Sequence, residues 1–133
     1  MLPHPIRLRR PWEEVPTATQ DRKAYLRRFN RPTGLDTWET VTLEIDRILY
    51  RGDVSLNGTP LGTIEVGEFF TSDITSLLRD ANELCVEVDP ATATAAAPVS
   101  HSVYIVEPDE PPGSPIGEVR LVIRHDLGEI SRE

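Results

Sequence analysis

The dominant pattern in the chain is an alternation of apolar and polar residues. In the segment 40–46, Val41, Leu43 and Ile45 fall on one face, while threonine, glutamate and aspartate fall on the other. The same alternation recurs in segments 53–57, 82–88 and 117–124, and shorter β-rich runs occupy 24–29 and 102–107. A period of two predicts antiparallel strands with one buried face. About eight such strands, with no long helical period, predict an all-β antiparallel sandwich of jelly-roll type.

Turn-forming residues separate these strands. Asn57-Gly58 stands between two apolar runs and predicts a tight hairpin, because both central residues of such a turn need positive φ. The less regular alternation in 24–29 predicts a β-bulge at that place.

Only the segment 73–82 has helical character. It predicts one or two turns, with Asp73 or Thr75 as the N-cap. Residues 89–116 are rich in alanine, threonine and proline and predict loops on either side of the run 102–107. Neither loop separates two apolar cores, so we expect residues 1–133 to form a single domain.

Charge is unevenly distributed along the chain. The 133 residues have a formal net charge of −8, which argues against a nucleic acid partner. Residues 1–31 nevertheless hold eight basic residues and three acidic ones. This segment is either a basic arm for an acidic partner or a strand edge whose arginines pair with acidic neighbours in the same fold. The second interpretation is favoured, because Arg7 and Arg9 alternate with Ile6 and Leu8.

The apolar and cysteine content bears on cellular location. No apolar run reaches the length of a signal-peptide core or a membrane span. We therefore expect a cytoplasmic chain with no membrane partner, unless a leader was removed. Cys85 is the only cysteine, which excludes an intrachain disulfide. It falls in a predicted strand, on the face opposite Leu84 and Val86.

A series of motifs spans residues 25–88 in a characteristic order. They are Tyr25-Leu-Arg-Arg-Phe29, Pro32, Val41-Thr-Leu-Glu-Ile45, Val54-Ser-Leu-Asn-Gly-Thr-Pro-Leu-Gly62, Phe69-Phe70, Asp73-Ile-Thr75, Leu78 and Asn82-Glu-Leu-Cys-Val-Glu-Val88. This series resembles the N-terminal sugar-binding domain of family 2 glycoside hydrolases, the group of β-galactosidase, β-glucuronidase and β-mannosidase. The resemblance implies a galactose-binding-like jelly roll. It also implies that Phe29, Phe69 and Phe70 lie in the core.

The same resemblance implies what this chain lacks. In the family, a second sandwich and a TIM barrel with two catalytic glutamates follow this domain, and the 133 residues hold only one such domain. The segment 108–117 also lacks the tryptophan and the Arg-Asp pair by which the family's domain helps to shape an active site. We therefore predict no catalytic residue and no glycosidase activity.

Metal chemistry has little support in the sequence. His4, His101 and His125 show no spacing typical of a transition-metal site. A structural calcium ion is the remaining alternative, since related modules often hold one at a loop end. Its weak candidate ligands lie near strand ends and are Asp36, Asp46, Asp53 and Asp89.

Aromatic residues are the main candidates for ligand binding. Sugar sites often offer a flat aromatic face with a few polar partners. Trp38, Tyr50 and Tyr104 have polar or loop neighbours and are candidate ligand-binding residues; packing in the fold is the competing interpretation. The sequence thus predicts a non-catalytic carbohydrate-binding-like module. The alternative is a protein-interaction or assembly domain that kept the sandwich, lost the sugar site, and pairs as a homodimer or with a partner protein.

Overall fold

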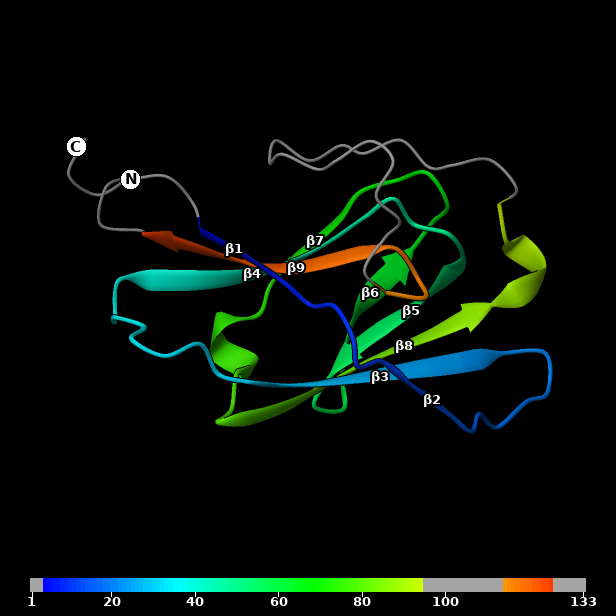
Figure 1. Cartoon of the computed structure of the whole chain (residues 1–133), viewed down its shortest axis with the longest axis horizontal. Coiled ribbons are helices and arrows are strands. Elements are labelled where there is room, and N and C mark those ends of the chain that lie inside the picture. Colours follow the sequence, from blue (N-terminus) through cyan, green and yellow to red (C-terminus); the bar gives the residue numbers. More distant parts are fainter. Residues whose placement is uncertain (1–3, 95–113, 126–133) are drawn as a thin grey trace.

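Two antiparallel β-sheets face each other in this structure, a computed structural model that describes residues 4–94 and 114–125 (Figure 1). The described strands are β1 (His4–Arg7), β2 (Glu13–Val15), β3 (Lys23–Asn30), β4 (Glu39–Asp46), β5 (Arg51–Leu56), β6 (Thr59–Ile64), β7 (Phe70–Asp73), β8 (Ala81–Asp89) and β9 (Glu118–His125). One sheet has the order β1-β9-β4-β7, and the other has the order β2-β3-β8-β5-β6. The predicted all-β sandwich is confirmed. The predicted strand at 102–107 lies outside the described residues.

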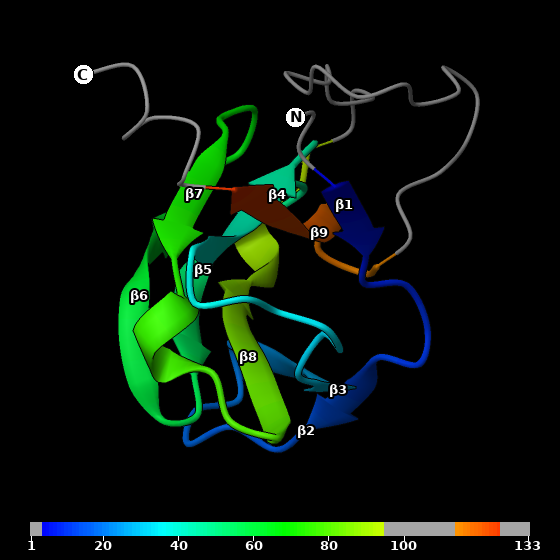
Figure 2. The ribbon, with the colours of Figure 1, turned by 90° about the vertical axis from the view of Figure 1, so that its left-hand side faces the viewer.

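The core lies between the two sheets, as Figure 2 shows from the side. Alternate residues of the central strands point inward, as the two-residue period predicts. Their buried side chains include Val41, Leu43 and Ile45 of β4, Val54 and Leu56 of β5, Leu84, Val86 and Val88 of β8, and Val119 and Leu121 of β9. Cys85 is half-buried on the opposite face of β8, as expected.

The β5–β6 hairpin turns at Asn57 and Gly58, whose φ angles are 52° and 85°. Positive φ at both positions is the hairpin geometry that the Asn-Gly pair predicts. The predicted bulge, however, is in the wrong strand. The pairing of β3 with β8 is continuous, and the register shifts instead between Val54 and Ser55 in the β5–β6 pairing. The irregular pattern of β3 comes from arginines on both of its faces, and no extra residue is inserted.

The predicted helical segment is reduced to a single 3-10 turn, η1 (Thr75–Leu77). The Asp73 carboxylate accepts hydrogen bonds from the Thr75 backbone N–H at 2.9 Å and from the Thr75 hydroxyl at 2.6 Å. The N-cap position is Ile74, so the predicted N-cap at Asp73 or Thr75 is wrong, although the Asp73 carboxylate still binds the start of the turn. The turn stops early because the chain has to enter β8 at Ala81, where it pairs with Asn30. A second 3-10 turn, η2 (Pro90–Thr92), follows β8.

Phe69 departs from the expectation that all three phenylalanines lie in the core. Its side chain is 38 % exposed, whereas Phe29 and Phe70 pack against the core. Phe70 is the first residue of β7, and side chains of adjacent residues in an extended chain point to opposite sides. Burial of Phe70 therefore leaves Phe69 facing outward.

The outer face of the β1-β9-β4-β7 sheet carries a buried group of charged residues. Arg120, Glu44 and Asp46 are each 5 % exposed or less. The Arg120 guanidinium lies 3.1 Å from the Glu44 carboxylate and 3.7 Å from that of Asp46. Alternation predicts polar residues here but says nothing of their burial. Mutual pairing is what allows such charges to be withdrawn from water.

Candidate binding cleft

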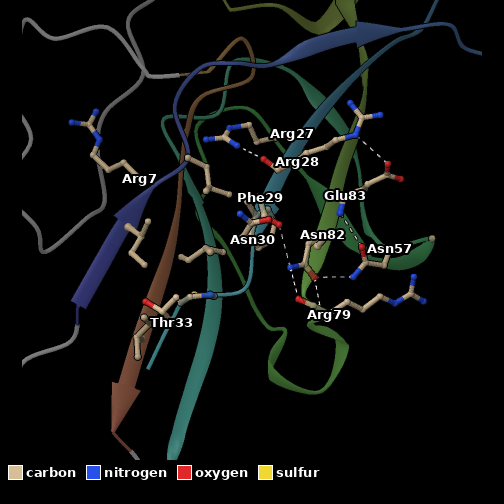
Figure 3. A pocket seen from close by; sticks show the side chains of 17 residues that line it. Arg7, Arg27, Arg28, Phe29, Asn30, Thr33, Asn57, Arg79, Asn82 and Glu83 are labelled. Carbon is tan, nitrogen blue, oxygen red and sulfur yellow. Dashed lines mark hydrogen bonds and ion pairs between the residues drawn. The ribbon is translucent and has the colours of Figure 1, made fainter. Parts of the chain in front are cut away.

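A cleft of about 1180 Å³ opens between the two sheets beside β1 and β3 (Figure 3). Apolar side chains from β1, β9 and the residue after β1 form one wall, namely Ile6, Leu8, Leu121 and Ile123. The opposite wall comes from Arg27–Asn30 of β3 and Ala81–Glu83 of β8. The β5–β6 turn and the segment after β3 complete the lining among the described residues. The cleft thus combines an apolar wall with a polar one, as small-molecule sites commonly do.

The inward face of β3 explains why the sheets leave space here. Residues that pair directly across an antiparallel sheet point to the same side. Arg27 pairs with Leu84, and Leu84 is fully buried, so Arg27 stands at an inward position between the sheets. Its neighbours on this face are Tyr25 and Phe29. A long cation therefore occupies a place where the pattern of the adjacent strand calls for a core residue.

Two of the three asparagines that line the cleft among the described residues, Asn57 and Asn82, use their amides within the fold. Asn82 is 1 % exposed, and its Nδ2 donates to the carbonyl oxygens of Arg79 and Phe29. Its Oδ1 accepts from the Arg79 backbone N–H and from Asn57 Nδ2. Asn57 Nδ2 also donates to the Leu77 carbonyl. These contacts tie the β5–β6 turn to the start of β8, and they leave little capacity in these two amides for a ligand.

Four arginines line the cleft, and two of them are paired with carboxylates. Arg7 contacts both carboxylate oxygens of Glu118, at 2.5 and 2.7 Å. Arg28 lies 2.8 Å from Glu13 and 3.3 Å from Glu83. The hydrogen bond that Arg28 donates to the Glu13 carboxylate is the main reason that the pKa of Arg28 is raised. These pairs, together with an Arg22–Asp53 pair at 3.1 Å, confirm that the basic N-terminal segment pairs within its own fold.

Arg27 and Arg79 differ from the other two. The Nε of Arg27 donates to the Arg9 carbonyl at 2.6 Å, and its Nη1 donates to the Arg28 carbonyl. Neither Arg27 nor Arg79 forms an ion pair with a carboxylate of the described residues. Burial lowers the pKa of Arg27, because it disfavours the charged guanidinium.

The aromatic candidates from the sequence do not come together in one site. Trp38 is 52 % exposed and precedes β4, whereas Tyr50 packs against the core and follows β4. Eight residues of strand, about 25 Å, separate the two ends of β4. Neither residue lines the cleft, and Tyr104 lies outside the described residues. Their roles in ligand binding stay predictions.

The four candidate calcium ligands do not converge either. Asp46 faces Arg120, Asp53 faces Arg22, and Asp89 accepts a hydrogen bond from the Ala91 backbone N–H at 3.1 Å. Asp36 precedes β4, at the opposite end of that strand from Asp46. Within residues 4–94 and 114–125, no group of three or more His, Cys, Asp or Glu side chains is arranged to hold a metal ion.

The cleft and its arginines were not predicted from the sequence. A signal was present in the run 24–29, where Tyr25, Arg27 and Phe29 share one face of a strand. This signal resembles an irregular strand pattern, because the position of an arginine relative to the core cannot be assigned until the pairing partner of its strand is known.

In the described part of the chain, no helix is long and apolar enough to cross a membrane.

Solved structures of glycosidases share this fold. A FMN-binding β-glucuronidase from Facaelibacterium prausnitzii L2-6 is 23 % identical, with a TM-score of 0.59 over 91 % of this chain and 22 % of its own. A β-glucuronidase from Bifidobacterium dentium is 25 % identical, with a TM-score of 0.53 over 78 % and 21 %. A glycosyl hydrolase family 2 member from Bacteroides cellulosilyticus is 16 % identical, with a TM-score of 0.53 over 79 % and 12 %.

The extent of these matches limits what they say. This chain spans less than a quarter of the length of each of the three enzymes. Comparisons with family models and with curated protein sequences give no match. The resemblance of this chain to a β-sandwich domain of family 2 glycosidases is therefore confirmed at the level of the fold.

Proposed function

We propose that this chain is a non-catalytic carbohydrate-binding module whose ligand lies in the cleft between β1 and β3. The observation that carries the proposal is the construction of that cleft. One wall is apolar, and the facing wall presents Phe29 beside hydrogen-bond donors. Sugar rings combine an apolar face with a rim of hydroxyl groups, so a site of this construction can contact both. The glycosidase fold is a second, weaker support, because a fold alone does not establish a function.

The carboxylates of the cleft support the non-catalytic part of the proposal. Glycoside hydrolysis generally needs two carboxyl groups that flank the scissile bond, about 5–9.5 Å apart. Glu83 is the only carboxylate among the described residues that line the cleft, and Arg28 pairs with it. We expect no hydrolysis of nitrophenyl glycosides by the purified chain.

Thermal shift and calorimetry with a panel of oligosaccharides test the proposal. A ligand at 100 times its dissociation constant adds about 2.7 kcal/mol to the free energy of unfolding. For a chain of this size that corresponds to a rise of several degrees in Tm. We expect at least one saccharide class to produce such a rise. If none of the panel shifts Tm or gives heat, the carbohydrate-binding proposal is wrong.

Two phenylalanines provide a matched pair of variants. Phe29→Leu keeps an apolar side chain in the cleft but removes the flat ring, and we expect weaker saccharide binding. Phe69→Leu makes the same change at an exposed ring outside the cleft lining, and we expect unchanged affinity. Trp38→Ala tests the exposed aromatic candidate separately. A loss of affinity there would place the ligand at the β3–β4 connection instead.

The assembly-domain alternative predicts a different outcome. Under that alternative the chain binds no saccharide and is a homodimer or heterocomplex in light scattering. One observation counts against a basic segment that binds an acidic partner protein. Arg7, Arg22 and Arg28 already form ion pairs with carboxylates of this fold.

A further inference from the structure

The charge of the cleft is opposite to that of the whole chain. The protein has a formal net charge of −8. The cleft lining, by contrast, includes four arginines and a single carboxylate among the described residues, although the guanidinium of Arg7 points away from the cleft (Figure 3). After the Arg28–Glu83 and Arg7–Glu118 pairs are taken into account, Arg27 and Arg79 have no carboxylate partner within residues 4–94 and 114–125. A local positive charge is thus maintained inside a negatively charged domain.

Arg27 is the residue that makes this charge unusual. It stands at an inward position, opposite the fully buried Leu84. Arg27 is only partly buried, so water still reaches it, but its charge lines the cleft between the two sheets. The partners of Arg27 are the carbonyl oxygens of Arg9 and Arg28, which orient the guanidinium but do not neutralise it.

The two carbonyl contacts leave part of the guanidinium available. They use the Nε–H and one Nη1–H, so the Nη2–H groups and the second Nη1–H have no partner among the described residues. Those remaining groups form the planar fork that binds both oxygens of a carboxylate. In Figure 3 the Arg27 guanidinium points away from the paired Arg28 and Glu83.

The neutral hydrogen-bonding groups of the cleft are not equally available. Asn82 uses both ends of its amide on Phe29, Arg79 and Asn57. The side-chain donors left for a ligand therefore include the neutral amide of Asn30 and the guanidiniums of Arg27 and Arg79. A neutral saccharide would leave the inward guanidinium unpaired, whereas an acidic one would neutralise it.

We propose that the cleft recognises an acidic saccharide, with the carboxylate of a uronic acid residue bound by the guanidinium of Arg27 and the sugar ring between Phe29 and the apolar wall. This inference rests on the proposed carbohydrate-binding function and specifies its ligand class. Sulfated saccharides offer the same anionic chemistry, so the test includes them as a separate arm. Arg79, an exposed residue of the cleft lining, carries a second guanidinium with no carboxylate partner in the described part of the chain, and it favours a ligand with more than one acidic unit.

Calorimetry with the wild-type protein is the first test. The ligands are a uronic acid oligosaccharide, its methyl ester, the corresponding neutral oligosaccharide, a sulfated neutral oligosaccharide and sodium acetate. We expect the acid to bind at least about tenfold more tightly than its methyl ester, because the ester keeps the ring and loses only the charge. Higher salt should reduce this preference.

Two arginine variants test which residue causes the preference for the acid over its methyl ester. Arg27→Met keeps a long apolar side chain and removes the guanidinium, and we expect the acid-to-ester ratio to fall to about one. Arg31→Met removes the same charge from an exposed residue outside the cleft lining, and we expect the ratio to persist. If Arg27→Met fails to fold, Arg27→Lys keeps the charge without the fork and should lower the ratio. The acid-to-ester ratio of the wild-type protein tests the acidic-ligand inference without any variant.

Each outcome has a separate meaning. Equal binding of the acid, the ester and the neutral sugar refutes the acidic-ligand inference and leaves the proposed function intact. Absence of binding to every saccharide refutes the proposed function as well. Binding of acetate as tightly as the uronic acid oligosaccharide refutes saccharide recognition in favour of simple anion binding. Tighter binding of the sulfated sugar supports the anionic class but assigns the anion as sulfate. A ratio that persists in Arg27→Met refutes the role of Arg27.

Discussion

Asn82 links the fold of this protein to its cleft, and its removal makes a sharp prediction. Its buried amide holds together three parts of the cleft wall, namely the Phe29 carbonyl, the chain at Arg79 and the Asn57 side chain. Asn82→Ala removes all four of these hydrogen bonds, whose lengths run from 2.8 to 3.3 Å. We expect the variant to be destabilised and to bind cleft ligands more weakly.

The size of the effect follows from the number and setting of these bonds. A typical intramolecular hydrogen bond contributes about 1 kcal/mol net, and a buried group left without a partner costs about 1–3 kcal/mol. Water can reach some of the freed groups, because the partners Arg79 and Asn57 are only partly buried or exposed. A loss of about 2–4 kcal/mol in the free energy of unfolding is therefore expected. That is a large fraction of the ~5–15 kcal/mol typical of a domain.

Urea denaturation followed by fluorescence measures this loss. With a slope of about 1–3 kcal/mol per molar urea, the midpoint should fall by roughly 1–2 M. Asn30→Ala is the matched control, because Asn30 is an exposed cleft residue whose side chain makes no hydrogen bond with the described residues, and it should change stability by less than about 0.5 kcal/mol. A loss below about 1 kcal/mol for Asn82→Ala, or an equal loss for both variants, would refute the structural role given to Asn82.

Three further predictions concern other parts of the sandwich. Gly52→Ala should lower stability by about 2 kcal/mol or more in urea denaturation, because a Cβ there would collide with the Glu87 carbonyl oxygen in the neighbouring strand; an unchanged midpoint would contradict the pairing. Arg120→Met should cost about 3 kcal/mol by the same assay, because the buried carboxylates of Glu44 and Asp46 both lose this cation and Arg124, 3.4 Å from Glu44, compensates only in part; a stabilised variant would contradict this. Burial, with a smaller contribution from Glu87, raises the pKa of the Cys85 thiol, so thiol labelling should be slower than for free cysteine near pH 8 and accelerate as pH rises; a rate independent of pH would contradict it.

The sandwich was predictable because its signals are local. Val41, Leu43 and Ile45 reveal their common face by spacing alone, and the structure buries all three. The Asn57-Gly58 turn needs only the φ preferences of two residues, and the structure gives both positive φ. These features depend on the chain within a few positions, so the sequence carries enough information to place them.

The errors come from features that depend on pairing. The bulge falls in β6, where Leu61 is the extra residue, because its position is set by how two strands meet, which no single run reveals. Phe69 is exposed because Phe70 opens β7, and the start of a short strand is hard to fix to one residue. Of the calcium candidates, Asp53 and Asp89 line one small pocket, whereas Asp36 and Asp46 lie at opposite ends of β4, since proximity to a strand end does not say which end of the sheet is meant.

The cleft shows why a departure from the pattern can be more informative than the pattern. A leucine at position 27 would face Leu84 and extend the core between the sheets, as Leu56 does on the other side of β8. An arginine there instead interrupts the apolar face of β3, and its guanidinium is held by carbonyl oxygens at the edge of an open space. Natural sequences break local rules mainly where function requires it. Arg27 is the residue that made the strand pattern irregular, and it is also the residue from which we infer an acidic ligand. The ratio of acid to ester binding tests that inference directly.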